Sequence, residues 1–220
     1  MMESVVRISS VGETWPMFAV VLCFDGRLAV VIGGGTVADR KVGGLLDAGA
    51  TVRVVAPIIA DGLRARAREA RASGELTLVE RPYEPADLDG AWYVVAATGD
   101  RTVQQAVADE CERRGIWCNA VDDPERCTAL LPAVHRSGDV IVAVSTSGSS
   151  PTLARILRDR IAGALPPSIG EIARTLAERR RLWQADGAST EDRDWAPEID
   201  ELLAAEIPRC PAFRNSSDRK

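Results

Sequence analysis

Three consecutive glycines near the start of the chain could bind the diphosphate group of a dinucleotide. They follow the apolar run Leu28–Ile32 and begin the spacing G-x-G-x-x-A, which ends at Ala38. In this spacing the first glycine permits a tight turn, the second lets backbone approach a pyrophosphate, and the small last residue lets strand and helix pack closely. Unpaired N–H groups at the helix N-terminus would attract the phosphates. The candidate contacts are the glycines and the first helical residues: Gly33, Gly34, Gly35, Thr36 and Val37.

As far as Val121, apolar runs alternate with amphipathic stretches. The expected helices cover 37–48, 59–72 and 102–114, and the expected strands are Leu28–Ile32, Thr51–Val55, Leu76–Val79, Ala91–Ala97 and Ile116–Val121. Strands that alternate with helices at this spacing predict right-handed βαβ units and a parallel sheet. The predicted fold class is therefore α/β, with a Rossmann-type parallel sheet. Because the glycines lie between a strand and a helix, a dinucleotide site is favoured over a tight turn without a ligand.

One edge of this sheet should collect further cofactor contacts, since ligands of parallel sheets bind at the carboxyl ends of the strands. That edge would bring together Pro57 and Ile58 after the second strand, Thr98 after the fourth and Asp122 after the fifth. The second strand ends in Val54–Pro57, without the carboxylate that often binds a ribose 2′-hydroxyl. These residues alone therefore leave both NAD and NADP open.

A serine-rich segment forms a second candidate anion site. The expected strand Val140–Ser145 precedes it, and an expected helix from Thr152 to about Ala162 follows it. Ser150 suits the N-cap of this helix and Pro151 its first position. A flexible loop is the alternative interpretation, but the position before a capped helix favours an anion site.

The composition indicates a globular chain. Of its 220 residues, 46% are hydrophobic and 27% are charged, and the net charge of −5 argues against non-specific binding to nucleic acid. No apolar run approaches the ~20 residues of a membrane span. The five cysteines are odd in number and form no C-x-x-C pair, so we expect reduced thiols. Together these features favour a cytoplasmic location. No His, Cys and Asp residues show the spacing of metal ligands, so we expect no tightly held structural metal.

Several motifs occur in an order that is typical of one family. They are Val31–Ala38 with Arg40-Lys41, Val54–Pro57, Ala96–Thr98, Cys118–Pro124, Leu131–Ala133 and Val142–Pro151. On these motifs the chain resembles the siroheme synthase dehydrogenase family, which comprises precorrin-2 dehydrogenases, some of which are also sirohydrochlorin ferrochelatases. The resemblance extends from about Trp15 to about Ala162.

The resemblance implies an activity and a domain order. The implied activity is NAD-dependent dehydrogenation of precorrin-2 to sirohydrochlorin in siroheme biosynthesis. A further candidate activity is the insertion of iron into sirohydrochlorin, in which Fe²⁺ would be a substrate. The implied assembly is a homodimer. The expected domains are an NAD-binding domain at 15–124, a dimerisation and substrate segment at 125–163, a helical region at 164–207 and a mobile tail at 208–220.

The resemblance also assigns candidate residues for the chemistry. Asp122 matches the family's catalytic aspartate and would accept the proton that leaves with the hydride. Without the resemblance, a simple turn aspartate would be the better interpretation. Candidates for the tetrapyrrole's carboxylates are Ser149, at the expected helix start, Arg136 and Arg155, although a surface role is the alternative for each arginine. Thr146 matches a loop hydroxyl that faces the substrate in the family, and His135 is a candidate for substrate or iron, with a structural or exposed role as the alternative.

Two segments depart from the family pattern. Ser147 stands where the family has a glycine, and Thr128–Leu131 replaces a stretch that is often rich in aromatic residues. Either difference could alter how the substrate fits. The competing hypothesis is a non-catalytic NAD-binding sensor, because a fold does not by itself determine a function.

Overall fold

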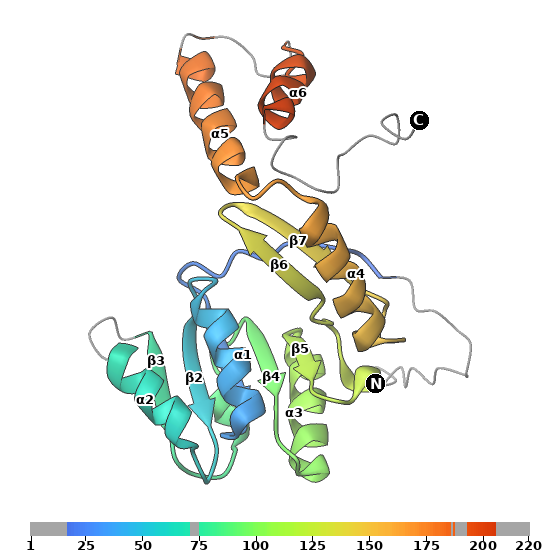
Figure 1. The fold of residues 1–220 in the computed structure, drawn as a ribbon. Coiled ribbons are helices and arrows are strands. Elements are labelled where there is room, and N and C mark those ends of the chain that lie inside the picture. The colour runs from blue at the N-terminus through green and yellow to red at the C-terminus, as the bar shows by residue number, and fades with distance from the viewer. Residues whose placement is uncertain (1–16, 71–74, 186, 188–192, 206–220) are drawn as a thin grey trace. The chain divides into compact units, whose positions relative to one another are not determined.

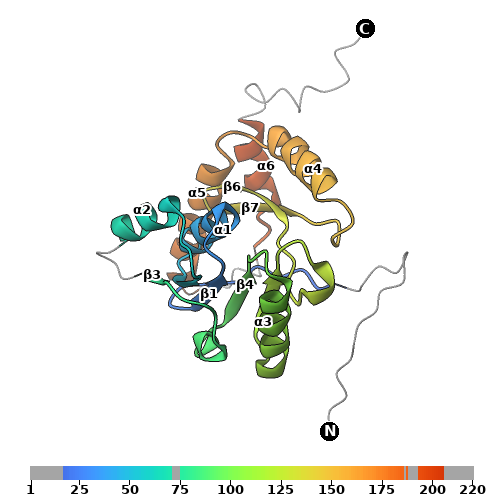
Figure 2. The same ribbon diagram turned by 90° about the horizontal axis from the view of Figure 1, so that it is seen from below.

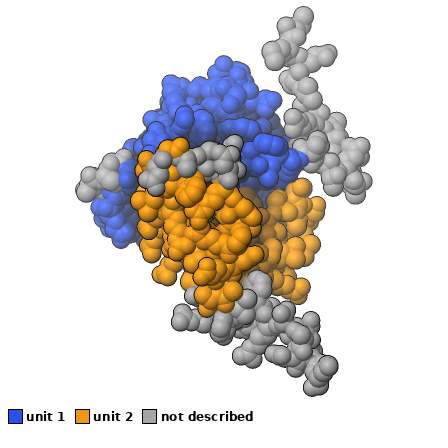
Figure 3. Space-filling view, turned by 90° about the horizontal axis from the view of Figure 1, so that it is seen from above, with its two compact units in different colours: residues 1–131 blue, residues 132–220 orange. Residues whose placement is uncertain are grey.

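The computed structural model describes residues 17–70, 75–185, 187 and 193–205 (Figure 1). These residues form two compact units, of which unit 1 ends at Leu131 and unit 2 begins at Pro132 (Figure 3). Trp15, Cys210 and the tail expected at 208–220 lie outside the described residues.

Unit 1 contains the predicted parallel sheet. Its strand order is β3-β2-β1-β4-β5, and each neighbouring pair runs parallel. The strands are β1 (Leu28–Ile32), β2 (Thr51–Val55), β3 (Leu76–Val79), β4 (Tyr93–Ala96) and β5 (Trp117–Ala120). The helices are α1 (Thr36–Leu46), α2 (Asp61–Glu69) and α3 (Arg101–Arg114), with 3₁₀ turns at Pro85–Leu88 and Pro124–Arg126. The predicted α/β class is confirmed.

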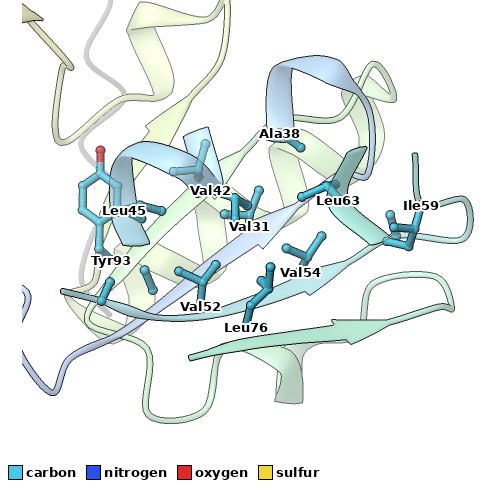
Figure 4. Close-up of a cluster of buried hydrophobic side chains, with 14 of the residues drawn as sticks. Val31, Ala38, Val42, Leu45, Val52, Val54, Ile59, Leu63, Leu76 and Tyr93 are labelled. Atoms are coloured by element: carbon cyan, nitrogen blue, oxygen red, sulfur yellow. The ribbon is translucent and has the colours of Figure 1, made fainter. Parts of the chain in front are cut away.

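Side chains alternate between the two faces of the sheet and so set its layers. Ala29 and Val31 of β1 pack with α1, whereas Val30 and Ile32 pack with the buried face of α3. All four side chains are buried because helices cover both faces of a parallel sheet. Figure 2 shows α1 and α2 on one side and α3 on the other, and Figure 4 shows the cluster beneath α1.

The start of α2 differs from the expected helix at 59–72. Ile59 is buried in the core beneath α1 and α2, and the backbone N–H of Ala60 donates to the carbonyl oxygen of Gly34 at 2.8 Å. These two residues therefore attach the loop after β2 to the glycines, and the helix begins only at Asp61. A tertiary contact, rather than local propensity, sets this boundary.

Unit 2 contains a hairpin and three helices. They are β6 (Ala133–Ser137), β7 (Val140–Val144), α4 (Pro151–Ala164), α5 (Ile169–Ala185) and α6 (Ala196–Ala204). The sequence predicts β7 but not β6, which pairs with it in an antiparallel register. The available signal was Gly138-Asp139, a two-residue hairpin loop in which Gly138 has a φ of 56°. The polar residues His135 and Arg136 interrupt the apolar pattern by which a strand is recognised in a sequence.

Three properties bear on the expectations from composition. Across the described ranges, no helix is both long and apolar enough to cross a membrane. In the same ranges, no three His, Cys, Asp or Glu side chains are grouped to hold a metal ion. The four described cysteines are free thiols, and burial raises the pKa of Cys127 to about 11, which keeps it protonated at neutral pH.

Candidate cofactor-binding and active site

The first two positions of the triplet must be glycine, because backbone atoms of other segments lie too close for a side chain. Gly33 has a φ of 126°, and a Cβ atom there would lie 2.3 Å from the carbonyl oxygen of Ala97. A Cβ atom on Gly34 would lie 2.1 Å from the carbonyl oxygen of Ile58. Both distances are far below van der Waals contact. These two positions therefore exclude a side chain because segments after β2 and β4 press against them.

Gly35 differs from its neighbours, because a Cβ atom there would meet no other heavy atom within 4 Å. Gly35 is also the N-cap residue of α1, and as a glycine it has no side chain that could accept a hydrogen bond from the first turn of this helix. The open space and the uncapped N–H groups lie at the same point. A diphosphate fits this arrangement, since its oxygens can accept from the backbone and interact favourably with the helix dipole.

The remaining cofactor candidates lie at the same edge of the sheet. The N–H of Gly33 donates to the carbonyl oxygen of Val55 at 2.9 Å, which joins the ends of β1 and β2. Pro57 and Ile58 follow β2 and are exposed, Ile58 by 81%. Thr98 follows β4, is half-buried, and accepts a hydrogen bond from the N–H of Asp100 at 3.1 Å. The structure thus brings together predicted residues that lie far apart in the sequence.

The geometry also fits the general rule for ligand sites in open parallel sheets. Successive connections place α1 and α2 on one face and α3 on the other, so the winding reverses between β1 and β4. Ligands bind outside the strand ends at such a reversal. Gly33, after β1, and Thr98, after β4, border this point.

Asp122 lies two residues beyond β5, exposed and in the left-handed region with a φ of 59°. Aspartate is among the few residues that tolerate this conformation. The turn is held by Gln104, a buried side chain of α3 that sequence reasoning did not single out. Its Nε2 donates to the carbonyl oxygen of Val121 at 2.8 Å and to that of Ala96 at 3.4 Å. Gln104 thereby joins the ends of β4 and β5 directly before Asp122.

Asp123 has a different role from the carboxylate beside it. It is buried, and its Oδ2 accepts from Arg126 and lies 3.6 Å from Nη1 of Arg101. Arg126 also donates to Gln105 of α3. The paired aspartates of the sequence are therefore not equivalent, since Asp123 anchors the turn and leaves Asp122 free to face solvent.

Lys41 is a further site residue to which sequence reasoning gave no role. It lies on α1, half-buried, within electrostatic reach of Asp122. Burial lowers the pKa of its ammonium group and the nearby Arg40 adds to this, whereas the carboxylate of Asp122 acts in the opposite direction. The signal in the sequence was Arg40-Lys41, six and seven residues after Gly34. The ammonium group of Lys41 therefore lies near Asp122, the candidate base.

All five candidate substrate residues lie in unit 2. His135 and Arg136 are on β6, and Arg155 is an exposed residue of α4. Thr146 is engaged within its own loop: its hydroxyl accepts from the N–H of Ser150 and donates to the carbonyl oxygen of Ser150, both at 3.0 Å. Ser149 is exposed, and its N–H donates to the carbonyl oxygen of Thr146 at 2.9 Å.

Two family models match the chain. A model described as putative NAD(P)-binding covers residues 20–133, and one described as sirohaem biosynthesis protein central covers residues 141–164. The chain belongs to the putative NAD(P)-binding family, and a segment of it also matches the central part of sirohaem biosynthesis proteins. The range matched by the first model includes the glycine triplet and α1.

Individual relatives agree with the family models. The chain is 40% identical over 172 residues to siroheme synthases of Salmonella typhimurium and Salmonella paratyphi B, which is 72% of this chain and 37% of each relative. It therefore spans little more than a third of the length of these curated relatives. A solved structure of SirC, a precorrin-2 dehydrogenase, matches with a TM-score of 0.67 at 28% identity, over 86% of this chain and 88% of that chain.

Proposed function

We propose that this protein oxidises precorrin-2 to sirohydrochlorin with NAD⁺ as the acceptor, as a step of siroheme biosynthesis. The observation that supports this most is the edge of the unit 1 sheet, where the uncapped N-terminus of α1 and the exposed carboxylate of Asp122 follow β1 and β5. The similarity to SirC, a precorrin-2 dehydrogenase, extends over most of both chains and supports the same activity.

The reaction removes one hydride and one proton from the macrocycle. NAD⁺, when bound, accepts the hydride. The chain's own residues position the reactants and accept the proton: backbone at Gly35, Thr36 and Val37 would hold the diphosphate, and Asp122 would take the proton on its carboxylate. Lys41 would balance the negative charge of Asp122 before the transfer. Gln104 and Asp123 keep the turn in one conformation, which fixes the position of the base.

Unit 2 is proposed to bind the substrate's carboxylates and to join two copies of the chain. Arg136, Arg155, His135, Thr146 and Ser149 are the proposed substrate contacts. A two-stranded sheet is marginally stable by itself, and no residue of β6 or β7 is buried. Three large apolar residues of α4 are exposed by 42–47%: Leu153, Ile156 and Ile161. A second copy that covers this surface would complete the core of unit 2.

The dimer has a direct test in light scattering after size-exclusion chromatography. The wild type should elute as a dimer and Ile156→Glu as a monomer, because the change places a charge in the proposed apolar contact. Arg68→Glu reverses an exposed charge on α2 of unit 1, outside the proposed contact, and should leave the dimer intact. A monomeric wild type at micromolar concentration would remove the dimer from the proposal without affecting the cofactor site.

The activity is tested by NADH formation from precorrin-2 and NAD⁺ under anaerobic conditions. Asp122→Asn is the informative variant, since asparagine also tolerates the left-handed conformation but cannot act as the base. We expect kcat to fall by about 100-fold or more, while the affinity for NAD⁺, measured by calorimetry, is unchanged. Asp47→Asn removes the same charge from the exposed far end of α1 and should leave kcat unaltered.

The outcomes separate the competing hypotheses. A folded wild type that binds NAD⁺ but forms no NADH would favour the sensor. Undiminished turnover in Asp122→Asn would remove the proposed base and leave the dehydrogenase activity standing. Iron insertion is measured separately, with sirohydrochlorin and Fe²⁺ or Co²⁺. The free thiols at Cys111 and Cys118 support a reducing compartment, and we propose the cytoplasm.

A further inference from the structure

An ion pair connects the first turns of α2 to the end of β3. Nη1 and Nη2 of Arg64 donate to Oε1 and Oε2 of Glu80 at 2.5 and 2.7 Å, so the guanidinium and the carboxylate meet in a two-point contact. Arg64 is the fourth residue of α2, and Glu80 directly follows β3. Figures 1 and 2 both show α2 beside β3. The pair lies at the carboxyl edge of the sheet, on the β2 side of the glycines.

The adenosine half of a bound cofactor would extend toward this pair. The diphosphate position at Gly35 is next to the loop after β2, because Ile58 contacts Gly34 and Ala60 bonds to it. In this fold the ribose 2′ position is recognised beyond the end of the second strand, by a carboxylate for NAD or by an arginine for the 2′-phosphate of NADP. Here Pro57 and Ile58 occupy the strand end, and α2 with Arg64 comes next.

Two other arginines, on α2 and β2, are held by acceptors. Arg66 bonds to Asp39 of α1 at 2.9 Å, and Arg53 donates to the carbonyl oxygen of Asp87 at 2.9 Å. Arg64 would suit a 2′-phosphate best, since a guanidinium binds phosphate through two parallel hydrogen bonds. Glu80 already occupies both of those donors. Arg64 also holds the pKa of Glu80 below its usual range, so Glu80 is ionised at neutral pH.

We propose that the Arg64–Glu80 ion pair sets the preference of this site for NAD over NADP. Glu80 engages the guanidinium that could otherwise bind a 2′-phosphate, and its own charge repels that phosphate. The 2′-hydroxyl of NAD carries no charge and meets neither obstacle. This inference rests on the cofactor placement proposed above and adds its specificity-determining residues.

The experiment measures dissociation constants by calorimetry, for NAD⁺ and for NADP⁺, without substrate. The wild type should bind NAD⁺ more tightly than NADP⁺. Glu80→Gln releases Arg64 and removes the repulsion, so its affinity for NADP⁺ should rise about tenfold, while that for NAD⁺ should stay within about twofold. Glu112→Gln, which neutralises an exposed glutamate of α3, is the matched control and should change neither constant. The pair is half-exposed, so the variants should fold.

A second variant identifies the group responsible. In Arg64→Met/Glu80→Gln the repulsion is gone but no guanidinium remains, so most of the gain for NADP⁺ should disappear. The same comparison with 2′,5′-ADP and ADP tests the phosphate without the nicotinamide half.

The failure of this inference is distinct from that of the cofactor site. Wild type that binds NAD⁺, together with Glu80→Gln that binds NADP⁺ no better than the Glu112→Gln control does, would overturn the role of the pair alone. A wild type that prefers NADP⁺ would overturn it as well. A folded wild type that binds neither cofactor would overturn the proposed site and, with it, this inference.

Discussion

The loops before α1 and α4 each lead from a strand into a helix, yet only one leaves its helix N-terminus open. Before α1, the N-cap residue Gly35 offers no side-chain acceptor. Before α4, Oγ of Ser150 accepts from the N–H of Leu153 at 3.2 Å, and the hydroxyl of Thr146 makes two hydrogen bonds to Ser150. The sequence predicts a candidate anion site at both loops. The structure supports an open donor set only at α1.

This difference shows that a hydroxyl group at a helix N-cap reduces the number of backbone N–H groups available to a ligand. A serine or threonine satisfies the orphan N–H groups of a helix and thereby stabilises it. A ligand must then compete with the protein's own side chain. Glycine leaves the N–H groups to the ligand, at the expense of a less stable helix start. The N–H groups at the start of α1 are therefore available to a ligand, whereas the start of α4 is capped by the protein itself.

The largest expected effect comes from filling Gly34. Gly34→Ala places a methyl group against the carbonyl oxygen of Ile58, and we expect the free energy of unfolding to fall by roughly 3 kcal/mol as the two loops separate. Urea denaturation followed by circular dichroism measures the change. Gly44→Ala is the control, because a Cβ atom at this exposed helical position meets nothing within 4 Å. It should stabilise α1 by about 0.5–1 kcal/mol. Equal stability of the two variants would contradict the close packing of the glycine loop.

A second substitution in the same loop separates binding from folding. Gly35→Ala adds a methyl group to open space, so the free energy of unfolding should change by less than about 1 kcal/mol. The same methyl group would obstruct the diphosphate, and the affinity for NAD⁺ should fall at least about tenfold. Calorimetry with NAD⁺ and thermal unfolding check the two halves. Unchanged affinity would place the diphosphate elsewhere.

The loop before α4 should respond in stability. Ser150→Ala removes the cap of α4 and should lower the free energy of unfolding by about 1 kcal/mol, as measured by urea denaturation. Ser149→Ala alters its exposed neighbour and should change the free energy by less than about 0.5 kcal/mol. If both variants were equally stable, the cap would contribute nothing and the contrast with α1 would weaken.

The smallest effect concerns Ser147, a residue other than glycine that has a φ of 52°. The left-handed conformation costs a non-glycine residue about 1–2 kcal/mol. Ser147→Gly removes that cost but adds about 0.5–1 kcal/mol of chain entropy. A net gain of about 0.5 kcal/mol is therefore expected from urea denaturation. Destabilisation instead would mean that the bond from the N–H of Ser147 to Oγ of Ser145 holds the turn without strain.

Much of unit 1 was predictable because its signals are local. The strands and α3 agree with the expected ranges to within two residues, and Gly115 ends α3 with a φ of 68°. The hairpin strand β6 was missed, because its side chains follow no clear alternation and its partner β7 decides its conformation. The late start of α2 was also missed, since it depends on the bond between Ala60 and Gly34.

The candidate site also has some features that the sequence reveals and others that depend on the folded chain. The spacing of the glycines and the position of Asp122 after β5 are properties of short segments, so the amino-acid sequence is enough to reveal them. The roles of Lys41 and Gln104 need the folded chain, because each depends on a partner more than fifteen residues away.

The order of amino acids alone determined the α/β class, the glycine-to-helix transition and the caps of α3 and α4, because neighbouring residues set these through backbone freedom and short-range hydrogen bonds. Folding in three dimensions decided which glycine excludes a side chain and which leaves space for a ligand. It also decided which of two adjacent aspartates is buried in an ion pair. The difference between the glycines arises from Ala97 and Ile58, residues that only the packed sheet brings against them.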